Sequence, residues 1–149
     1  MPANRIQEIP LRYGSGLIRR QIHGEAGEPG RLIQSILAGL PMAELADLRE
    51  ALEVPMERVA ARIGMSRATF HRRQKAGLLS ADESDRAMRL ARLVGQAVAV
   101  FGNLAAARNW LNAPQHGLSG AVPLDYAATE VGAREVENLI GRIDYGVYA

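Results

Sequence analysis

Side chains that can hydrogen-bond phosphates and base edges gather in one short stretch of the chain, from position 66 to position 75. Arginine and lysine donate to phosphate oxygens and to guanine, while serine, threonine and histidine add smaller hydrogen-bonding groups. On a helix beginning at Arg67, these side chains would face outward, toward a groove of DNA. The residues predicted to contact DNA are Ser66, Arg67, Thr69, His71, Arg72, Arg73 and Lys75.

The residues around this stretch have the spacing of a helix-turn-helix. Ala60 is small enough to let a second helix approach closely, and Gly64, four positions later, can take the positive φ that the turn requires. Phe70 follows six positions after Gly64 and can join Val59 and Ile63 between the two helices. Helix pairs with a glycine turn also occur in ordinary bundles, so this pattern indicates a DNA-reading segment and does not by itself establish one.

Charge is distributed unevenly along the chain, although the formal net charge is only +2. Between Met56 and Leu79 six basic residues stand against one acid, whereas between Gln96 and Ala149 three stand against five. This asymmetry predicts that the middle of the chain meets a polyanion and that the C-terminal part does not. The alternative is a basic face that is merely solvated.

The last residues of the chain have the chemistry of a segment that inserts into a partner. Tyrosine is a favoured anchor at protein interfaces, glycine lets the backbone bend, and arginine, aspartate and the terminal carboxylate can pair with charged groups in a cleft. The alternative is a frayed terminus without a role. The residues predicted to bind a partner are Arg142, Asp144, Tyr145, Gly146, Val147, Tyr148 and Ala149.

No group of residues in the sequence has the composition of a catalytic site. The chain holds three scattered histidines and no cysteine. Ser119 lies in a turn, but Ala121 stands where a nucleophile elbow needs a second glycine. The pair Gly14 and Gly16 is too short to indicate a phosphate loop. We therefore expect no enzyme, no metal, no cofactor and no small-molecule substrate.

Apolar residues recur at helical spacing over most of the chain, and no segment requires a β-strand. Ser66 and the pair Ser80 and Glu83 are predicted to cap helices, the latter as a capping box, while glycines 77 and 102 end them. The last helix is expected to begin at Ala133. The predicted helices cover residues 31–40, 45–52, 56–63, 67–76, about 81–101, 104–111, a short segment from 123, and 133–143.

The predicted fold class is all-α, with a helix-turn-helix part followed by a small helical domain that binds a partner or forms a dimer. Glycine and proline are frequent up to Gly30, so residues 1–30 are predicted to be a flexible arm, with a short helix over 17–23 as the alternative. Residues 31–79 are assigned to the DNA-binding domain, and residues 80–149 to the second domain with its tail.

The composition favours a cytoplasmic protein. Cysteine is absent, as is common in a reducing compartment. No apolar stretch approaches the ~20 residues that span a bilayer, and the first ten residues lack the apolar core of a signal peptide. We expect no membrane association.

From about Gly39 to the end, the sequence resembles the Xre/MbcA/ParS antitoxin family. The matching elements follow one another in a specific order, although each alone is weak. They are Glu83 to Arg86, Arg89 to Arg92, Val100 to Gly102, Ala106 to Arg108, Trp110 to Asn112 with Pro114, Leu118 to Gly120, Pro123 to Asp125, Thr129, Gly132, Val136, Leu139 and Gly146.

The resemblance implies an antitoxin that forms a homodimer, represses its own operon by binding operator DNA, and blocks a RES-domain toxin with its C-terminal domain. Toxins of that class resemble ADP-ribosyltransferases, and they degrade NAD or transfer its ADP-ribose. The chemistry would then belong to the partner. The alternative is a dimeric helix-turn-helix transcription regulator that has no toxin partner.

Overall fold

A computed structural model describes residues 16–25 and 27–146. Over these residues the chain is all-α, as predicted, and the one β feature there is an isolated bridge between Pro41 and Leu78. The helices are α2 (Leu17–Ile22), α3 (Pro29–Ala38), α4 (Leu45–Leu52), α5 (Met56–Arg62), α6 (Arg67–Ala76), α7 (Ala81–Phe101), α8 (Leu104–Leu111), α9 (Pro123–Tyr126) and α10 (Glu130–Asp144), with 3-10 turns η1 (Met42–Glu44) and η2 (His116–Leu118).

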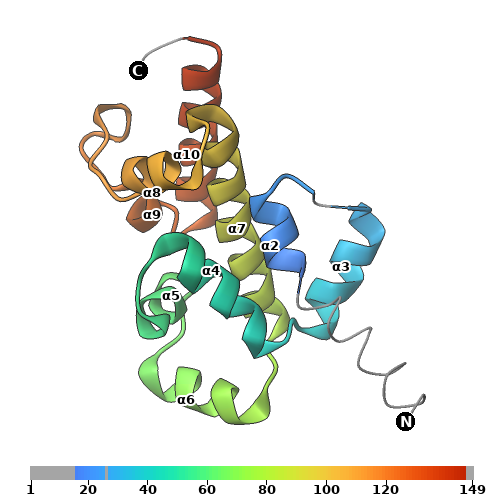
Figure 1. The fold of residues 1–149 in the computed structure, drawn as a ribbon. Coiled ribbons are helices and arrows are strands. Elements are labelled where there is room, and N and C mark those ends of the chain that lie inside the picture. The colour runs from blue at the N-terminus through green and yellow to red at the C-terminus, as the bar shows by residue number, and fades with distance from the viewer. Residues whose placement is uncertain (1–15, 26, 147–149) are drawn as a thin grey trace.

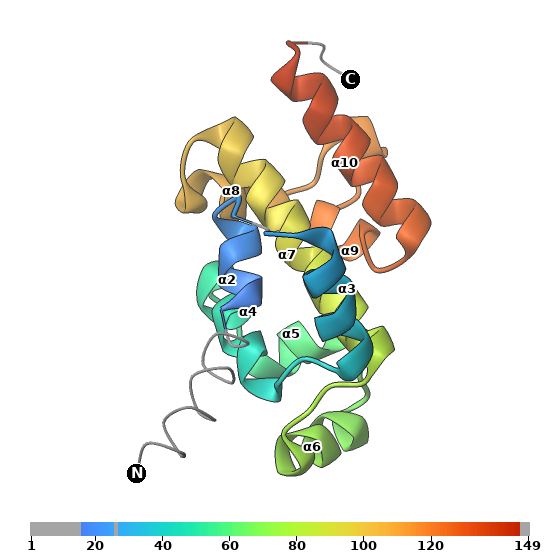
Figure 2. The same cartoon turned by 90° about the vertical axis from the view of Figure 1, so that its right-hand side faces the viewer.

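Helix α7 is the axis of the molecule, and α2, α3, α8 and α10 all pack against it (Figures 1 and 2). Its start is fixed by the predicted capping box of Ser80 and Glu83, and Gly102 ends it in the left-handed conformation. One face of α7 is apolar along most of its length and includes the fully buried Ala87, Val94 and Ala97. The single core therefore continues from the predicted DNA-binding part into the C-terminal part.

Two arginines join these parts on the side of α7 that carries α4, α5, α8 and α9. Arg108 Nε of α8 donates to the Ala51 carbonyl near the end of α4, at 2.9 Å, and Arg108 Nη1 lies 3.3 Å from Glu53 Oε2. Arg62 of α5 is largely buried, and its Nη1 lies 3.2 Å from Asp125 Oδ1 of α9. That ion pair lacks hydrogen-bond geometry, since Nε and Nη1 of Arg62 have no hydrogen-bond partner among the described residues.

The N-terminal segment differs from the predicted flexible arm. Residues 1–15 lie outside the described part of the chain, but Leu17–Ile22 forms helix α2, which buries Ile18 and Ile22 against α7. Gly95 of α7 permits this packing, because an added Cβ there would lie 2.5 Å from the Gln21 carbonyl oxygen. The prediction of a loose arm is therefore wrong for Leu17–Ile22, and the short-helix alternative holds there.

Helix α3 also begins earlier than predicted. Proline occupies its first turn, and the Glu28 side chain accepts a hydrogen bond from the Gly30 N–H at 3.1 Å, so the N-cap is Glu28 rather than a residue near Arg31. The segment predicted to be a flexible arm, residues 1–30, therefore contains all of α2 and the first two residues of α3.

A buried carboxyl group holds α2 in place. Glu44 is inaccessible to solvent, and its Oε1 accepts a hydrogen bond from the Ile18 N–H at 3.0 Å, while its Oε2 has no hydrogen-bond partner among the described residues. Burial raises the pKa of Glu44 to about 7, although the hydrogen bond from Ile18 acts in the opposite direction. The folded chain therefore favours the protonated form of Glu44 more strongly than the unfolded chain does.

We expect stability to fall as the pH rises from about 4.5 to about 7. The folded chain keeps the Glu44 proton to a higher pH than the unfolded chain, whose pKa is near 4.5. This contribution is complete below that pH and is lost at up to about 1.4 kcal/mol per pH unit. Glu44→Gln keeps an acceptor for Ile18 without a charge, so it should raise the free energy of unfolding by about 1 kcal/mol at pH 8, measured by urea denaturation. Equal stability of both proteins at pH 8 would contradict the argument.

Within residues 16–25 and 27–146, no helix is by itself long and apolar enough to cross a membrane. Helices α7 and α8 reach the required length and composition only as a pair, which is bent by 116°.

Candidate nucleic-acid interface and partner-binding surface

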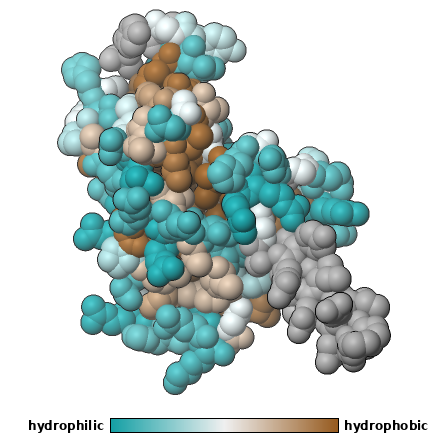
Figure 3. Space-filling view, in the orientation of Figure 1, coloured by the Kyte–Doolittle hydropathy of each residue, from teal (hydrophilic) through white to brown (hydrophobic). Residues whose placement is uncertain are grey.

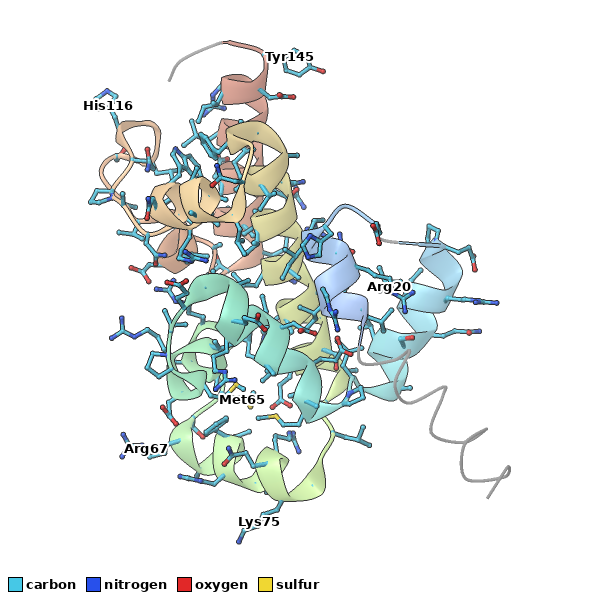
Figure 4. The ribbon with its side chains drawn as sticks, in the orientation of Figure 1. Arg20, Met65, Arg67, Lys75, His116 and Tyr145 are labelled. Carbon is cyan, nitrogen blue, oxygen red and sulfur yellow. The ribbon has the colours of Figure 1, made fainter. Side chains whose placement is uncertain are left out.

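Helices α5 and α6 form the helix-turn-helix that the spacing predicted. Val59, Ile63 and Phe70 are buried between them, and Gly64 takes a φ of +82° in the turn. The chain then returns inward, because the Met65 N–H donates to the Ala60 carbonyl at 2.9 Å and the Met65 side chain is buried. Figure 4 shows Met65 directed toward the helix pair.

An arginine outside the motif supports this turn. Arg86 of α7 places its Nη1 3.3 Å from the Ile63 carbonyl oxygen, to which it donates. The same Nη1 would lie 2.9 Å from a Cβ at position 64, so a side chain there would displace the end of Arg86, and the φ of +82° itself favours glycine. Sequence spacing within the motif contains no signal for Arg86, because it is 23 residues from the group it contacts.

The outer surface of α6 is basic and exposed. Arg67, His71, Arg72 and Lys75 are all exposed and make no hydrogen bond or ion pair with the described residues. Arg67 and Lys75 project away from the body of the protein (Figure 4), and the surface over α6 is hydrophilic (Figure 3). This surface has the charge and accessibility that contact with a polyanion needs.

The two hydroxyl residues of the predicted set are used in part by the helix itself. Ser66 is the N-cap, as predicted, and its Oγ accepts from the Thr69 N–H at 3.1 Å and donates to Thr69 Oγ1 at 3.0 Å. Both groups lie at the start of α6, where backbone N–H groups also face outward.

Arg73 differs from the other basic residues of α6. Its Nε donates to Glu83 Oε1 at 2.8 Å, and the same oxygen accepts from the Ser80 N–H at 2.8 Å within the capping box of α7. Burial raises the pKa of Glu83, but the hydrogen bonds from Arg73 and Ser80 and the charge of Arg73 together outweigh it and lower the pKa overall. Arg73 thus binds the start of α7, and a role in DNA contact remains a prediction for it.

Arg73→Ala should lower the free energy of unfolding by about 2 kcal/mol, because it leaves a buried carboxylate without its cation. Arg72→Ala removes the same charge from an exposed position and should change stability by less than about 0.5 kcal/mol. The contribution of Arg73 requires ionised Glu83, so it is present above about pH 4.5 and is lost as the pH falls through the lowered pKa of Glu83. Urea denaturation of both variants at pH 7 and pH 3 measures this, and equal stabilities at pH 7 would contradict it.

The C-terminal surface is built on α10. This helix begins at Glu130, three residues before the predicted start, because the Thr129 side chain accepts from the Gly132 N–H at 3.0 Å and caps it. Val136, Leu139 and Ile140 are buried against the core. An added Cβ at Gly132 would lie 1.7 Å from the Tyr126 carbonyl oxygen, so this glycine lets α9 and α10 meet closely.

The predicted tail begins later than the sequence indicated. Arg142 and Asp144 belong to the last turn of α10, and Tyr145 is its C-cap, followed by Gly146 with a φ of +77°. Tyr145 is 87% exposed and points away from the protein at the end of α10 (Figure 4). Val147, Tyr148 and Ala149 lie outside the described residues. Among the described residues of the predicted set, Tyr145 is therefore the one tyrosine, and it is exposed.

An apolar strip lies next to this end of α10. Phe101 and Trp110 pack with ring centroids 5.3 Å apart, and both are only partly buried, as is Ile143 of α10. Figure 3 shows hydrophobic surface along the upper part of the molecule, over α7, α8 and α10. Trp110 packs against the core and also contributes to this strip.

Comparison with known proteins identifies both halves of the chain. Residues 31–92 match the antitoxin Xre-like helix-turn-helix domain, and residues 96–146 match the antitoxin Xre/MbcA/ParS C-terminal toxin-binding domain. The chain is 31% identical over 132 residues to the protein named Antitoxin Xre of Yersinia enterocolitica, and this alignment covers 87% of the chain and 89% of that protein.

Two further relatives of the same name match shorter parts. Antitoxin Xre of Pseudomonas putida is 38% identical over 68 residues, covering 46% of this chain and 43% of the relative. Antitoxin Xre of Photorhabdus laumondii is 42% identical over 72 residues, covering 48% and 49%. Helix α2 precedes both family matches, although it packs into the same core.

Proposed function

The chain belongs to the Xre/MbcA/ParS family of antitoxins, with a helix-turn-helix and a toxin-binding domain, and from this membership we propose that it neutralises a RES-domain toxin and represses its own operon. The toxin would consume NAD, either by degrading it or by transferring its ADP-ribose. The protein would act in the cytoplasm, as a homodimer on operator DNA, and would itself catalyse nothing.

The observation that carries this proposal is the separation of two surfaces on one rigid axis. The exposed basic face of α6 lies at one end of the molecule, and Tyr145 with the apolar strip lies at the other (Figures 1 and 4). A protein with this arrangement can hold DNA and a second protein at once, because neither ligand covers the site of the other.

The end of α10 supports inhibition by insertion. Tyr145 is exposed at the tip of a helix whose apolar residues Val136, Leu139 and Ile140 are packed against the core, so its ring is accessible to a partner, and tyrosine is among the side chains that dominate interfaces. The neighbouring Phe101 and Trp110 supply apolar surface that a partner protein bound at Tyr145 would cover. We infer that the toxin packs on this strip while the tail from Tyr145 onward enters its NAD-binding cleft.

Co-expression with the adjacent reading frame tests the proposal. The expected result is a stoichiometric complex with a RES-domain protein that consumes NAD alone and stops doing so in the presence of this chain. DNA from upstream of the pair should be retarded by the chain in a gel. If the chain binds this DNA but recovers no partner, and the adjacent protein leaves NAD intact, the protein is a transcription regulator without a toxin.

A further inference from the structure

Helix α6 is held in place by little apolar packing. Of its ten residues, Phe70 is the one that is buried, and the helix lies at one end of the molecule (Figures 1 and 2). One buried ring fixes where a helix touches its support, but it leaves the rotation of the helix about that point open. Such a rotation would move every side chain on the outer surface of α6. Other contacts must therefore fix the orientation of this helix.

Arg73 makes a contact that can fix this rotation. At 100° per residue it lies about 60° from Phe70, on the inner side of α6, whereas Arg72 lies about 160° from Phe70, on the outer side. Arg73 Nε donates to Glu83 Oε1 at 2.8 Å, and 26% of the Arg73 side chain and 9% of the Glu83 side chain are exposed. A hydrogen bond between charged groups is strong and directional, the more so where water is largely excluded.

Glu83 is itself held firmly in the fold. Its Oε1 also accepts from the Ser80 N–H at 2.8 Å, and Ser80 Oγ accepts from the Glu83 N–H at 3.1 Å. The next residue, Ser84, is inaccessible to solvent, and its Oγ accepts from the Leu40 N–H at 2.8 Å. The start of α7 is thus tied to the segment that follows α3, so a bond to Glu83 places α6 relative to the whole core.

Two further contacts hold the segments on either side of α6. Before the helix, the Ile63 carbonyl accepts from Arg86 Nη1 of α7 at 3.3 Å. After the helix, the Gly77 carbonyl accepts from the Met42 N–H at 2.8 Å. The bond from Arg73 acts on the helix between these two ends.

From these contacts we infer that Arg73 and Glu83 are positioning residues for sequence recognition, and that Arg73 does not itself contact DNA. Their bond fixes the rotation of α6 and so places the side chains that meet base edges. The inference rests on the proposed operator binding. Recognition of base edges requires groups held within about 0.5 Å, whereas attraction to phosphates acts over ~8–10 Å. Loss of the bond should therefore reduce sequence preference and spare general affinity for DNA.

The surroundings of Arg73 favour this role over direct contact with DNA. A phosphate contact made by Arg73 would take it from Glu83 and leave a buried carboxylate without its cation. The exposed residues Arg67, Arg72 and Lys75 can reach phosphates without that loss.

A double-mutant cycle with Arg73→Ala, Glu83→Ala and the combined variant tests the inference. Affinity is measured at one salt concentration for a duplex from upstream of the gene pair and for a scrambled duplex of equal length. Each variant should lose about 10-fold or more of the preference for the upstream duplex, with affinity for the scrambled duplex within about threefold of wild type. The combined variant should lose no more than either single variant, because both remove one bond. The ratio of the two affinities is insensitive to the fraction of folded protein.

Two matched controls separate positioning from loss of a cap and from loss of charge. Ser80→Ala removes the hydroxyl of the capping box but keeps the bond between Arg73 and Glu83, so it should keep the preference. On the scrambled duplex, Arg72→Ala should reduce the magnitude of the salt slope by about 0.9 per subunit, and Arg73→Ala should leave it unchanged.

Direct contact of Arg73 with DNA predicts the opposite result for Glu83→Ala. That variant would free Arg73 and remove a negative charge, so DNA binding would hold or strengthen, while Arg73→Ala alone would weaken binding and reduce the salt slope. This pattern would overturn the inference.

Residual dipolar couplings of the backbone amides test the same bond without DNA, because they report the orientation of α6 relative to α7. In the wild type and in Ser80→Ala, both helices should fit one rigid body. In Arg73→Ala and Glu83→Ala, the couplings of α6 should fall below those of α7, and couplings that stay unchanged in both would overturn the inference. Equal affinity of the wild type for the two duplexes, with the couplings of α6 lowered in both variants, would count against the proposed repression and leave the positioning bond established.

Discussion

Deleting residues 145–149 is expected to weaken inhibition of the toxin at least about 1000-fold and to leave operator affinity unchanged. The deletion keeps α10 through Asp144, so the packed residues Val136, Leu139 and Ile140 and the Thr129 cap stay in place. It removes the exposed Tyr145 ring and the terminal residues that we propose occupy the NAD-binding cleft. Central anchors at interfaces contribute about 2 to 4 kcal/mol or more each, and two tyrosines are lost here. NAD consumption by the toxin, measured against increasing antitoxin, gives the inhibition constant.

Point substitutions separate insertion from general loss of contact. Tyr145→Ala should reproduce a large part of the loss of inhibition that the deletion causes. It should not change the melting temperature, because Tyr145 is 87% exposed. Tyr126→Ala removes a tyrosine from α9 that is 41% exposed in the same domain, and it should leave inhibition within about threefold of wild type. Full inhibition by the deleted chain would show that the toxin is blocked by the apolar strip or by another surface.

The sequence correctly predicted the helix ends that depend on residues close together in the chain. Ser66 caps α6, Ser80 and Glu83 form the capping box of α7, and Gly77 and Gly102 end these helices in the left-handed conformation. Each feature depends only on residues within one turn of it, so it can be read from a single sequence.

Contacts between residues far apart in the chain account for what the sequence did not reveal. Helix α2 has six residues in a glycine-rich segment, and it is held by Glu44, 26 positions from its partner Ile18, and by the close approach at Gly95. Arg73 has the spacing of a DNA contact, but Glu83 from the next helix binds it. Residue type and periodicity could not distinguish Arg73 from Arg72, because only the packing of α6 against α7 does so.

The same long-range contacts explain why two functions share one small core. Arg108 binds the end of α4 from α8, and Arg62 lies against Asp125 of α9. Arg62 belongs to the basic count that suggested contact with a polyanion, whereas Arg108 lies in the more acidic C-terminal part, yet both arginines join the two halves of the chain. The orientation of α6 relative to α10 is therefore set by specific contacts as well as by the shared helix α7.

The double variant Arg67→Ala/Arg72→Ala is expected to reduce operator affinity at least about 1000-fold while leaving toxin inhibition intact. Both side chains are exposed on α6, and neither is bonded to another described residue, so they are available to DNA and their loss should not affect folding. A bidentate arginine contributes about 1 to 3 kcal/mol to base recognition, and a dimer would lose four such side chains. Gel retardation with operator DNA measures the affinity.

Salt dependence distinguishes direct contact from an indirect effect. If Arg67, Arg72 and Lys75 each neutralise a phosphate, the slope of log affinity against log salt is about −2.7 per subunit, and the double variant reduces it to about −0.9. The variant Arg19→Ala/Arg134→Ala removes the same charge from α2 and α10, where both residues are about two-thirds exposed and pair with Asp47 and Glu130. It should keep the wild-type slope, because DNA responds to cations at the contact and little to net charge beyond the ~8–10 Å over which salt screens. Equal slopes for all three proteins would place the DNA on a surface other than α6.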